Sequence, residues 1–223
     1  MNPLLFLIPG GLIAFLLSKK GGGDVLTYTV GSDAEVNALF SALPPQGQRY
    51  LSQVLQVAQE EGVSPFLLFA IMSRESNYGL ALSSNMTGDA GHGRGLMQID
   101  DRSDTAWLNA NPWKDAYTNI KRGAQILNMK LAYFLLGGNG TVTVPDSYAS
   151  RLGTSGGDYQ DPRPLSGDML ARAGVAAYNS GQGAVLYALA AGYDPDSFTA
   201  GGNYGADVLA REAALRDEYK NLV

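Results

Sequence analysis

The feature that most constrains this fold is an uninterrupted run of apolar residues from Phe66 to Met72. Ser64 and Pro65 stand directly before it, and both are favoured residues at the start of a helix. A helix that is apolar on all its faces has to be covered by other elements on every side. The sequence therefore predicts a central buried helix that carries Glu75 at its C-terminal end.

Helical signals also precede this run. Ser32 and Glu35 have the spacing of a capping box, and apolar residues at one-face spacing follow until Pro44. A second helix is expected over about 47–61, where Gly62 closes it. The part of the chain before the apolar run therefore adds two helices that can cover it.

The rest of the chain is expected to alternate loops with further helices. A glycine-rich loop runs from Gly79 to about Asp104, and residues 137–167 are expected to be irregular apart from a short strand over 141–144. Apolar periodicity predicts the remaining helices over about 111–136, 168–179, 184–191 and 204–221. The predicted fold class is mainly α, or α+β with a minimal sheet.

Composition excludes several classes of protein. Hydrophobic residues make up 45% of the chain and charged residues 17%, which excludes a disordered chain. There is no cysteine, which excludes disulfides, iron–sulfur clusters and thiol catalysis. The net charge is −5 and no basic run is longer than two residues, as in the lysine pair at 19 and 20, so we expect no nucleic-acid partner.

The N-terminal 23 residues differ from the rest. Met1 to Ser18 carry no charged side chain, and two lysines and three glycines follow. A signal peptide would carry its positive charge before the apolar run, and a soluble helix would show a polar face. We therefore expect residues 3–17 to be a retained anchor in a lipid membrane, followed by a folded domain over 24–223.

Glu75 is the first candidate for chemistry. Dry surroundings and the negative end of a helix dipole both raise the pKa of a carboxyl group. A glutamic acid that stays protonated near neutral pH can donate its proton to the leaving oxygen of a glycosidic bond. The alternative is an exposed carboxylate at a helix end, paired with Arg74.

Asp89 and Asp100 lie on the glycine-rich loop, and glycosidases commonly use two carboxyl groups. One alternative is that these aspartates bind their own backbone in Asx-turns. A second is a metal site with His92 and Asp101, although the spacing fits neither a calcium loop nor a zinc motif. His92 is the only histidine, and a solvated loop position is expected for it.

Tyr178 and Asn179 close an alanine-rich segment whose small side chains permit close helix contact. The amide of Asn179 offers a donor and an acceptor, which suits an N-acetyl group, and Tyr178 offers a ring and a hydroxyl. The alternative is that Asn179 is a helix C-cap before a turn at Gly181.

Together these segments resemble the goose-type lysozymes and their relatives, the lytic transglycosylases. The resemblance covers roughly residues 64–219 apart from 137–167, and four ordered segments carry it: Glu75-Ser76, Gly95-Leu96-Met97-Gln98, Ala177-Tyr178-Asn179-Ser180-Gly181 and Tyr204-Gly205-Ala206-Asp207-Val208-Leu209-Ala210-Arg211. It implies a lysozyme-like fold and cleavage of the β-1,4 bond between N-acetylmuramic acid and N-acetylglucosamine in peptidoglycan glycan strands. It implies no cofactor and no metal.

The resemblance also implies roles for single residues. Glu75 matches the catalytic acid, and Asp89 and Asp100 match the aspartates that position water. The expected substrate contacts are Ser76, Gln98, Tyr178, Asn179 and Tyr204. Because bacterial transglycosylases typically lack the loop aspartates, hydrolysis with inversion is favoured. Arg94 departs from the family, which often has an aromatic residue there.

Two other functions stay open. A lytic transglycosylase would leave 1,6-anhydro ends, and a non-catalytic wall-binding or virion structural protein would release no fragments. The lysines beside the apolar segment favour a cytoplasmic domain, whereas a wall-cleaving enzyme needs the other side of the membrane. The expected location is therefore membrane-anchored, either at the periplasmic face of a cell envelope or in the membrane of a phage virion, whose topology is set by assembly.

Overall fold

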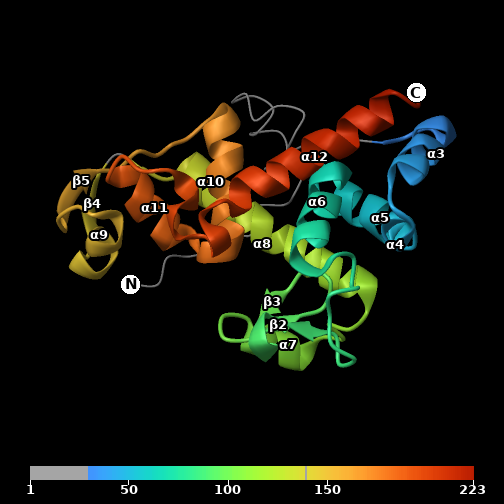
Figure 1. Ribbon diagram of the computed structural model, residues 1–223, viewed down its shortest axis with the longest axis horizontal. Helices are drawn as coiled ribbons and strands as arrows, with labels where there is room; N and C mark the ends of the chain where they lie inside the picture. The colour runs from blue at the N-terminus through green and yellow to red at the C-terminus, as the bar shows by residue number, and fades with distance from the viewer. Residues whose placement is uncertain (1–29, 139) are drawn as a thin grey trace.

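The computed structural model describes residues 30–138 and 140–223 (Figure 1). The expected membrane segment over residues 3–17 and the domain boundary after residue 23 lie outside these residues. Within 30–138 and 140–223, no helix combines the length and apolar character that crossing a membrane needs.

The described chain is mainly helical with small antiparallel sheets, as the sequence predicts. The helices are α3 (Asp33–Ala42), α4 (Pro45–Gln48), α5 (Leu51–Glu61), α6 (Pro65–Ser76), α7 (Thr105–Ala110), α8 (Ala116–Leu136), α9 (Asp146–Leu152), α10 (Gly167–Ser180), α11 (Gln182–Ala190) and α12 (Tyr204–Lys220). Short 3₁₀ turns are η1 (Asp89–Gly91), η2 (Pro195–Phe198) and η3 (Ala200–Gly202). The strands are β1 (Thr87–Gly88), β2 (Gly93–Arg94), β3 (Ile99–Asp100), β4 (Thr141–Val144) and β5 (Gly157–Gln160).

Local capping signals place the first helices where the sequence predicts them. Ser32 and Glu35 form the reciprocal capping box at the start of α3. Gly62 ends α5 with a left-handed φ of 65°, a conformation that glycine adopts without steric cost. The helix expected over 47–61 is divided, because the chain leaves helical geometry at Tyr50 between α4 and α5.

The core is built around α6, every residue of which from Pro65 to Met72 is buried. α5 and α12 pack against α6, and α10 packs against both α8 and α12. Gly174 on α10 lets α8 approach closely, since a Cβ there would lie 2.3 Å from Leu131 Cδ2. The predicted central helix and the predicted close contact of the alanine-rich helix are both confirmed.

The glycine-rich loop was expected to lack strands, and this expectation is wrong. β1, β2 and β3 form an antiparallel sheet in which Gly93 pairs with Gly88 on one side and with Asp100 on the other. These strands have two residues each, too few to show an alternating pattern in the sequence. The helix expected over 111–136 is α8, and it starts later than residue 111 because Asp115 caps it.

The segment 137–167 is more ordered than expected. The strand over 141–144 is confirmed as β4, but it pairs with β5, and α9 lies between the two strands. The side chains of Val142 and Val144 are buried, which ties this hairpin to the core beside α11. It lies at the opposite end of the molecule from α3 (Figure 1).

Candidate active site

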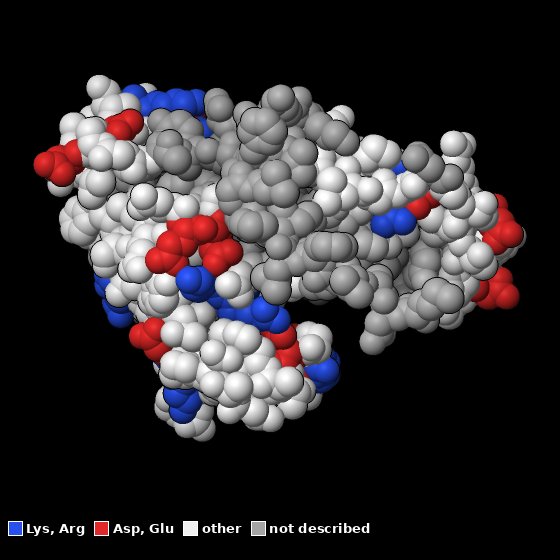
Figure 2. All heavy atoms as spheres, turned by 180° about the vertical axis from the view of Figure 1, so that it is seen from behind, with Lys and Arg blue, Asp and Glu red and all other residues white. Residues whose placement is uncertain are grey.

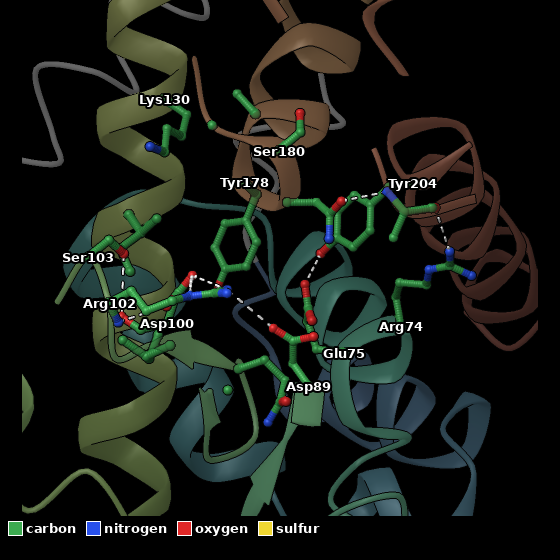
Figure 3. Close-up of a pocket in the computed structure, with 18 residues that line it drawn as sticks. Arg74, Glu75, Asp89, Asp100, Arg102, Ser103, Lys130, Tyr178, Ser180 and Tyr204 are labelled. Atoms are coloured by element: carbon green, nitrogen blue, oxygen red, sulfur yellow. Dashed lines mark hydrogen bonds and ion pairs between the residues drawn. The ribbon is translucent and has the colours of Figure 1, made fainter. Parts of the chain in front are cut away.

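A cleft of about 580 Å³ lies where the end of α6, the β1–β3 sheet, α8, α10 and the start of α12 meet (Figure 3). Its lining residues are Arg74, Glu75, Asp89, Gly93, Gln98, Ile99, Asp100, Arg102, Ser103, Ile126, Lys130, Ala177, Tyr178, Asn179, Ser180, Gly181, Ala200 and Tyr204. Acidic and basic side chains are intermixed on the described part of the face in Figure 2, which shows no continuous basic patch.

Glu75 is the next-to-last residue of α6, and its Oε1 accepts a hydrogen bond from the hydroxyl of Tyr204. Burial raises the pKa of Glu75 to about 7. The Tyr204 hydroxyl and the charge of Arg74 oppose that rise in pKa, and the charge of Asp89 adds to it. Arg74 itself pairs with Asp207 at 3.3 Å, so the alternative in which Arg74 pairs with Glu75 is wrong.

Asp196, which the sequence analysis missed, places the start of α12 and hence Tyr204. Its side chain is fully buried and accepts from the backbone N–H groups of Gly205 at 2.6 Å and Ala206 at 3.0 Å. Arg172 donates to the same carboxylate at 2.6 Å. A buried carboxylate at a helix N-terminus satisfies donors that the helix itself leaves open.

Asp89 and Asp100 are joined by Arg102, another residue that the sequence analysis missed. Arg102 donates to Asp100 through Nε at 3.0 Å and Nη2 at 2.8 Å, and through Nη2 to Asp89 at 3.4 Å. This pairing lowers the pKa of Asp100. The backbone N–H of Arg102 also donates to Asp100 at 2.8 Å, so the Asx-turn given as an alternative is present at Asp100 as well.

The alternative of a metal site finds no support. Within the described residues, no three His, Cys, Asp or Glu side chains are grouped so that they could hold an ion. His92 Nδ1 lies 3.0 Å from Asp101 Oδ1, and its side chain is 47% exposed, as expected for a loop histidine. Asp101 also accepts from Arg94, which lies over the ring of Trp113.

Gln98 lines the cleft in a left-handed backbone conformation, with a φ of 48°. Its side chain lies against Gly88 and Gly93, where a Cβ would come within 2.2 and 2.1 Å of Gln98 Oε1. Gln98 Nε2 donates to the carbonyl of Gly95 at 2.8 Å. The two glycines are therefore required by a close approach of a side chain, and they leave Gln98 fixed at the cleft wall.

Tyr178 and Asn179 also line the cleft, while Ser76 does not. The hydroxyl of Tyr178 donates to the carbonyl of Met97 at 2.8 Å, and Asn179 Oδ1 accepts from Ala200 N at 2.8 Å. Asn179 lies within α10 and does not cap it, since the C-cap is Gly181. Ser76, expected to contact substrate, is instead fully buried, and its hydroxyl donates to Leu96 O at 2.8 Å.

Comparison with known proteins adds independent information. The family model described as "Lysozyme g" matches residues 44–133. A lysozyme g of Epinephelus coioides is 30% identical over 171 residues, which are 74% of this chain and 73% of the relative. One of Dromaius novaehollandiae is 39% identical over 79 residues, 35% of this chain and 36% of the relative. One of Struthio camelus is 47% identical over 55 residues, 25% of this chain and 26% of the relative.

The chain belongs to the goose-type lysozyme family. It is therefore a glycosidase of the lysozyme kind, and the resemblance carried by the four sequence segments is confirmed. The family-model match contains Glu75 and the whole β1–β3 sheet, and it ends within α8. Tyr178 and Tyr204 lie beyond that match and complete the cleft of this lysozyme from α10 and α12.

Two cations of this lysozyme cleft, Arg102 and Lys130, were not singled out from the sequence. Arg102 follows Asp100 by two residues, a spacing that permits the Asx-turn and the ion pair found here. Lys130 lies on α8 among apolar and polar residues and carries no local signal of a site. Its position in the cleft depends on how α8 packs against α10.

Proposed function

We propose that this chain is a muramidase that hydrolyses the β-1,4 bond between N-acetylmuramic acid and N-acetylglucosamine in peptidoglycan, with inversion. One observation carries the proposal: Glu75 faces the cleft with a pKa of about 7, and its hydrogen-bond partner is the neutral hydroxyl of Tyr204. A carboxylic acid that keeps its proton near neutrality is the general acid that glycoside cleavage requires.

In this mechanism Glu75 donates its proton to the bridging oxygen as the bond from that oxygen to the muramic C1 breaks. A water molecule attacks C1 from the opposite face, forms the new C–O bond and gives its proton to an aspartate. The products are a reducing muramic end and a free 4-hydroxyl group on the N-acetylglucosamine. An inverting enzyme of this kind needs roughly 6.5–9.5 Å between its two carboxyl groups, so that a water fits between them.

Of the two aspartates, Asp89 is the better candidate for the base. Arg102 lies 2.8 Å from Asp100 but 3.4 Å from Asp89, so it binds Asp89 less closely. The Asp89 side chain is also 66% exposed. The charge of Asp89 also raises the pKa of Glu75, which supports a position in the same cleft near the proton donor. Asp100 then acts as a positioning residue, because it holds the guanidinium that orients Asp89.

The remaining cleft residues would bind the sugars. Tyr178 and Gln98 form part of the wall, and each is held by a hydrogen bond to a backbone carbonyl. Asn179 uses its carbonyl oxygen to accept from Ala200, which leaves its amide N–H groups for the carbonyl of an acetamido group. Tyr204 would act through Glu75, since its hydroxyl sets the orientation of that carboxyl group.

Digestion of purified peptidoglycan in ¹⁸O-labelled water tests the reaction. We expect fragments with reducing ends that carry one ¹⁸O, released first as the α-anomer. Unlabelled 1,6-anhydro ends would identify a transglycosylase, and absence of soluble fragments would identify a wall-binding protein. Asp89→Asn is expected to lower the initial rate more than Asp100→Asn, and the reverse order would assign the base to Asp100.

We also propose, from the sequence alone, that residues 3–17 hold this enzyme at a lipid membrane of a cell envelope or a virion. Their uncharged apolar composition supports the proposal. The full chain is expected to float with lipid vesicles in a density gradient. Replacing Leu7 and Leu12 by Asp is expected to abolish flotation, and equal flotation of both proteins would exclude the anchor.

A further inference from the structure

Three cations line the cleft within the described residues, and Lys130 differs from the other two. Arg74 pairs with Asp207 at 3.3 Å, and Arg102 pairs with Asp100 at 2.8 Å. Lys130 donates to Gln182 Oε1 at 2.5 Å, and this partner is a neutral amide. In the described chain Lys130 forms no ion pair within 4.0 Å, although its side chain is part-buried.

Glycoside cleavage by Glu75 and Asp89 does not require Lys130, and burial of its ammonium group is energetically unfavourable. Burial lowers the pKa of Lys130, and the charge of Asp104 only partly opposes this effect. Asp104 is itself engaged by Arg122, whose Nε donates to it at 2.7 Å. A part-buried cation without an acidic partner gains a strong interaction when an anion reaches it.

The surroundings of Lys130 indicate what kind of anion fits. Ile126 precedes it by one turn on α8 and also lines the cleft, so an apolar side chain and the ammonium group share one face of this helix. In Figure 3, Lys130 lies at the same end of the cleft as Ser180, apart from Asp100 and Arg102. A ligand group that joins a small apolar part to a carboxylate would satisfy both residues.

We propose that Lys130 binds a carboxylate carried by the muramic acid residue or by the peptide attached to it, with Ile126 against the adjoining methyl group. This inference rests on the proposed function, and it adds a basis for substrate choice. N-acetylglucosamine is neutral, whereas muramic acid carries a lactyl group that ends in a carboxylate or continues into an acidic peptide. Lys130 therefore makes the cleft select muramyl glycans over neutral β-1,4 polymers of N-acetylglucosamine.

The test compares binding of three soluble ligands to the full chain carrying Glu75→Gln, so that no ligand is consumed. The ligands are glycan fragments with peptides, the same fragments after the peptides are removed, and chitin oligosaccharides of equal length. Lys130→Met is expected to weaken binding of at least one anionic ligand by about tenfold, and to change binding of the neutral ligand by less than about twofold. The anionic ligand with the larger loss identifies whether the carboxylate is on the lactyl group or on the peptide.

Lys121→Met is the matched control, since Lys121 lies on the same helix, pairs with Glu60 at 2.7 Å and does not line the cleft. It is expected to leave all three affinities unchanged. An equal loss for neutral and anionic ligands, or no loss for either anionic ligand, would overturn the proposal. A structural defect lowers all three affinities together, so the ratio of affinities separates it from loss of charge recognition.

A separate measurement, the release of fragments from peptidoglycan, tests the proposed function itself. If the chain with Glu75 intact releases no fragments from peptidoglycan, the muramidase proposal fails. The binding comparison still reports whether Lys130 recognises a carboxylate, because it does not depend on turnover.

Discussion

The α6–α12 helix pair holds two glutamates that serve different purposes, Glu75 where the pair meets the cleft and Glu212 midway along α12. The helices run antiparallel, so the end of α6 with Glu75 meets the start of α12 with Tyr204. The start of α6 meets the end of α12, where the ring of Phe66 packs edge-on against Tyr219 at 5.1 Å. Burial raises the pKa of both Glu75 and Glu212.

The difference lies in the partner of each carboxyl group. Glu212 accepts from Arg216 Nε at 2.7 Å and is 2% exposed, so its charge is neutralised by an ion pair inside the protein. Glu75 accepts from a hydroxyl and lines the cleft. Burial alone therefore does not make a proton donor. A neutral partner and access to the cleft separate Glu75 from Glu212.

The largest expected difference between the two glutamates is in enzyme activity after each is replaced by glutamine. Glu75→Gln is expected to lower the rate of fragment release from peptidoglycan by about 10³-fold, because the amide has no acidic proton to donate. Glu212→Gln is expected to leave the rate per folded molecule within about threefold. Initial rates at pH 6 measure both, and equal losses would mean that the two carboxyl groups do not differ in function.

Stability should respond in the opposite way. Glu212→Gln is expected to lower the free energy of unfolding by about 2 kcal/mol, because it removes the charge-assisted hydrogen bonds between the buried carboxylate and Arg216. Urea denaturation measures the change. The double variant with Arg216→Met should lose less than the sum of the two single losses, and strict additivity would show that the ion pair is not the cause.

Glu75→Gln should make the protein more stable, and the gain should depend on pH. The pKa of Glu75 rises from 4.5 in the unfolded chain to about 7 in the fold, so its stabilising contribution is present below pH 4.5 and lost as pH rises through 7. Glutamine does not titrate. The variant is therefore expected to exceed the parent by roughly 3 kcal/mol at pH 8, with a much smaller difference at pH 4. A gain that is the same at both pH values would contradict the raised pKa.

The smallest expected effect is a shift of the pH–rate profile. Tyr204→Phe removes a hydrogen bond that lowers the pKa of Glu75, so the basic limb of kcat/KM should move to higher pH. Asp89→Asn removes a charge that raises the same pKa, and in its residual activity the limb should move to lower pH. Shifts in the same direction for both variants would exclude Glu75 as the group that titrates.

Much of the helical fold follows from signals that lie close together in the sequence. Ser32 with Glu35, Gly62, and Ser64 with Pro65 each act within one helix turn, and each marks a helix end where the structure has one. The unbroken apolar run before Glu75 predicts a central helix because only full burial suits such a surface. Four ordered segments were then enough to indicate the family.

The features that the sequence did not predict depend on contacts between distant residues. Each strand of the β1–β3 sheet has only two residues and is defined by its backbone pairing with a neighbouring strand. The sequence around Gly93 therefore gives no strand signal of its own. Asp196 acts through α12 and Arg172, and Lys130 reaches the cleft only because α8 packs against α10. For Ser76 the resemblance identified the position correctly but not the direction of its side chain. Tertiary packing turns the hydroxyl inward to Leu96 O and away from the cleft.

The burial of α6 has a consequence for how this lysozyme responds to heat. Its amide protons are expected to be among the slowest to exchange with solvent, because opening this helix means opening the whole core. Asp89 and Asp100 lie on strands and turns of two or three residues, which can open while the core stays closed. Warming should therefore first loosen the side of the cleft that prepares the water, and activity should decline below the melting temperature while the proton donor is still in position.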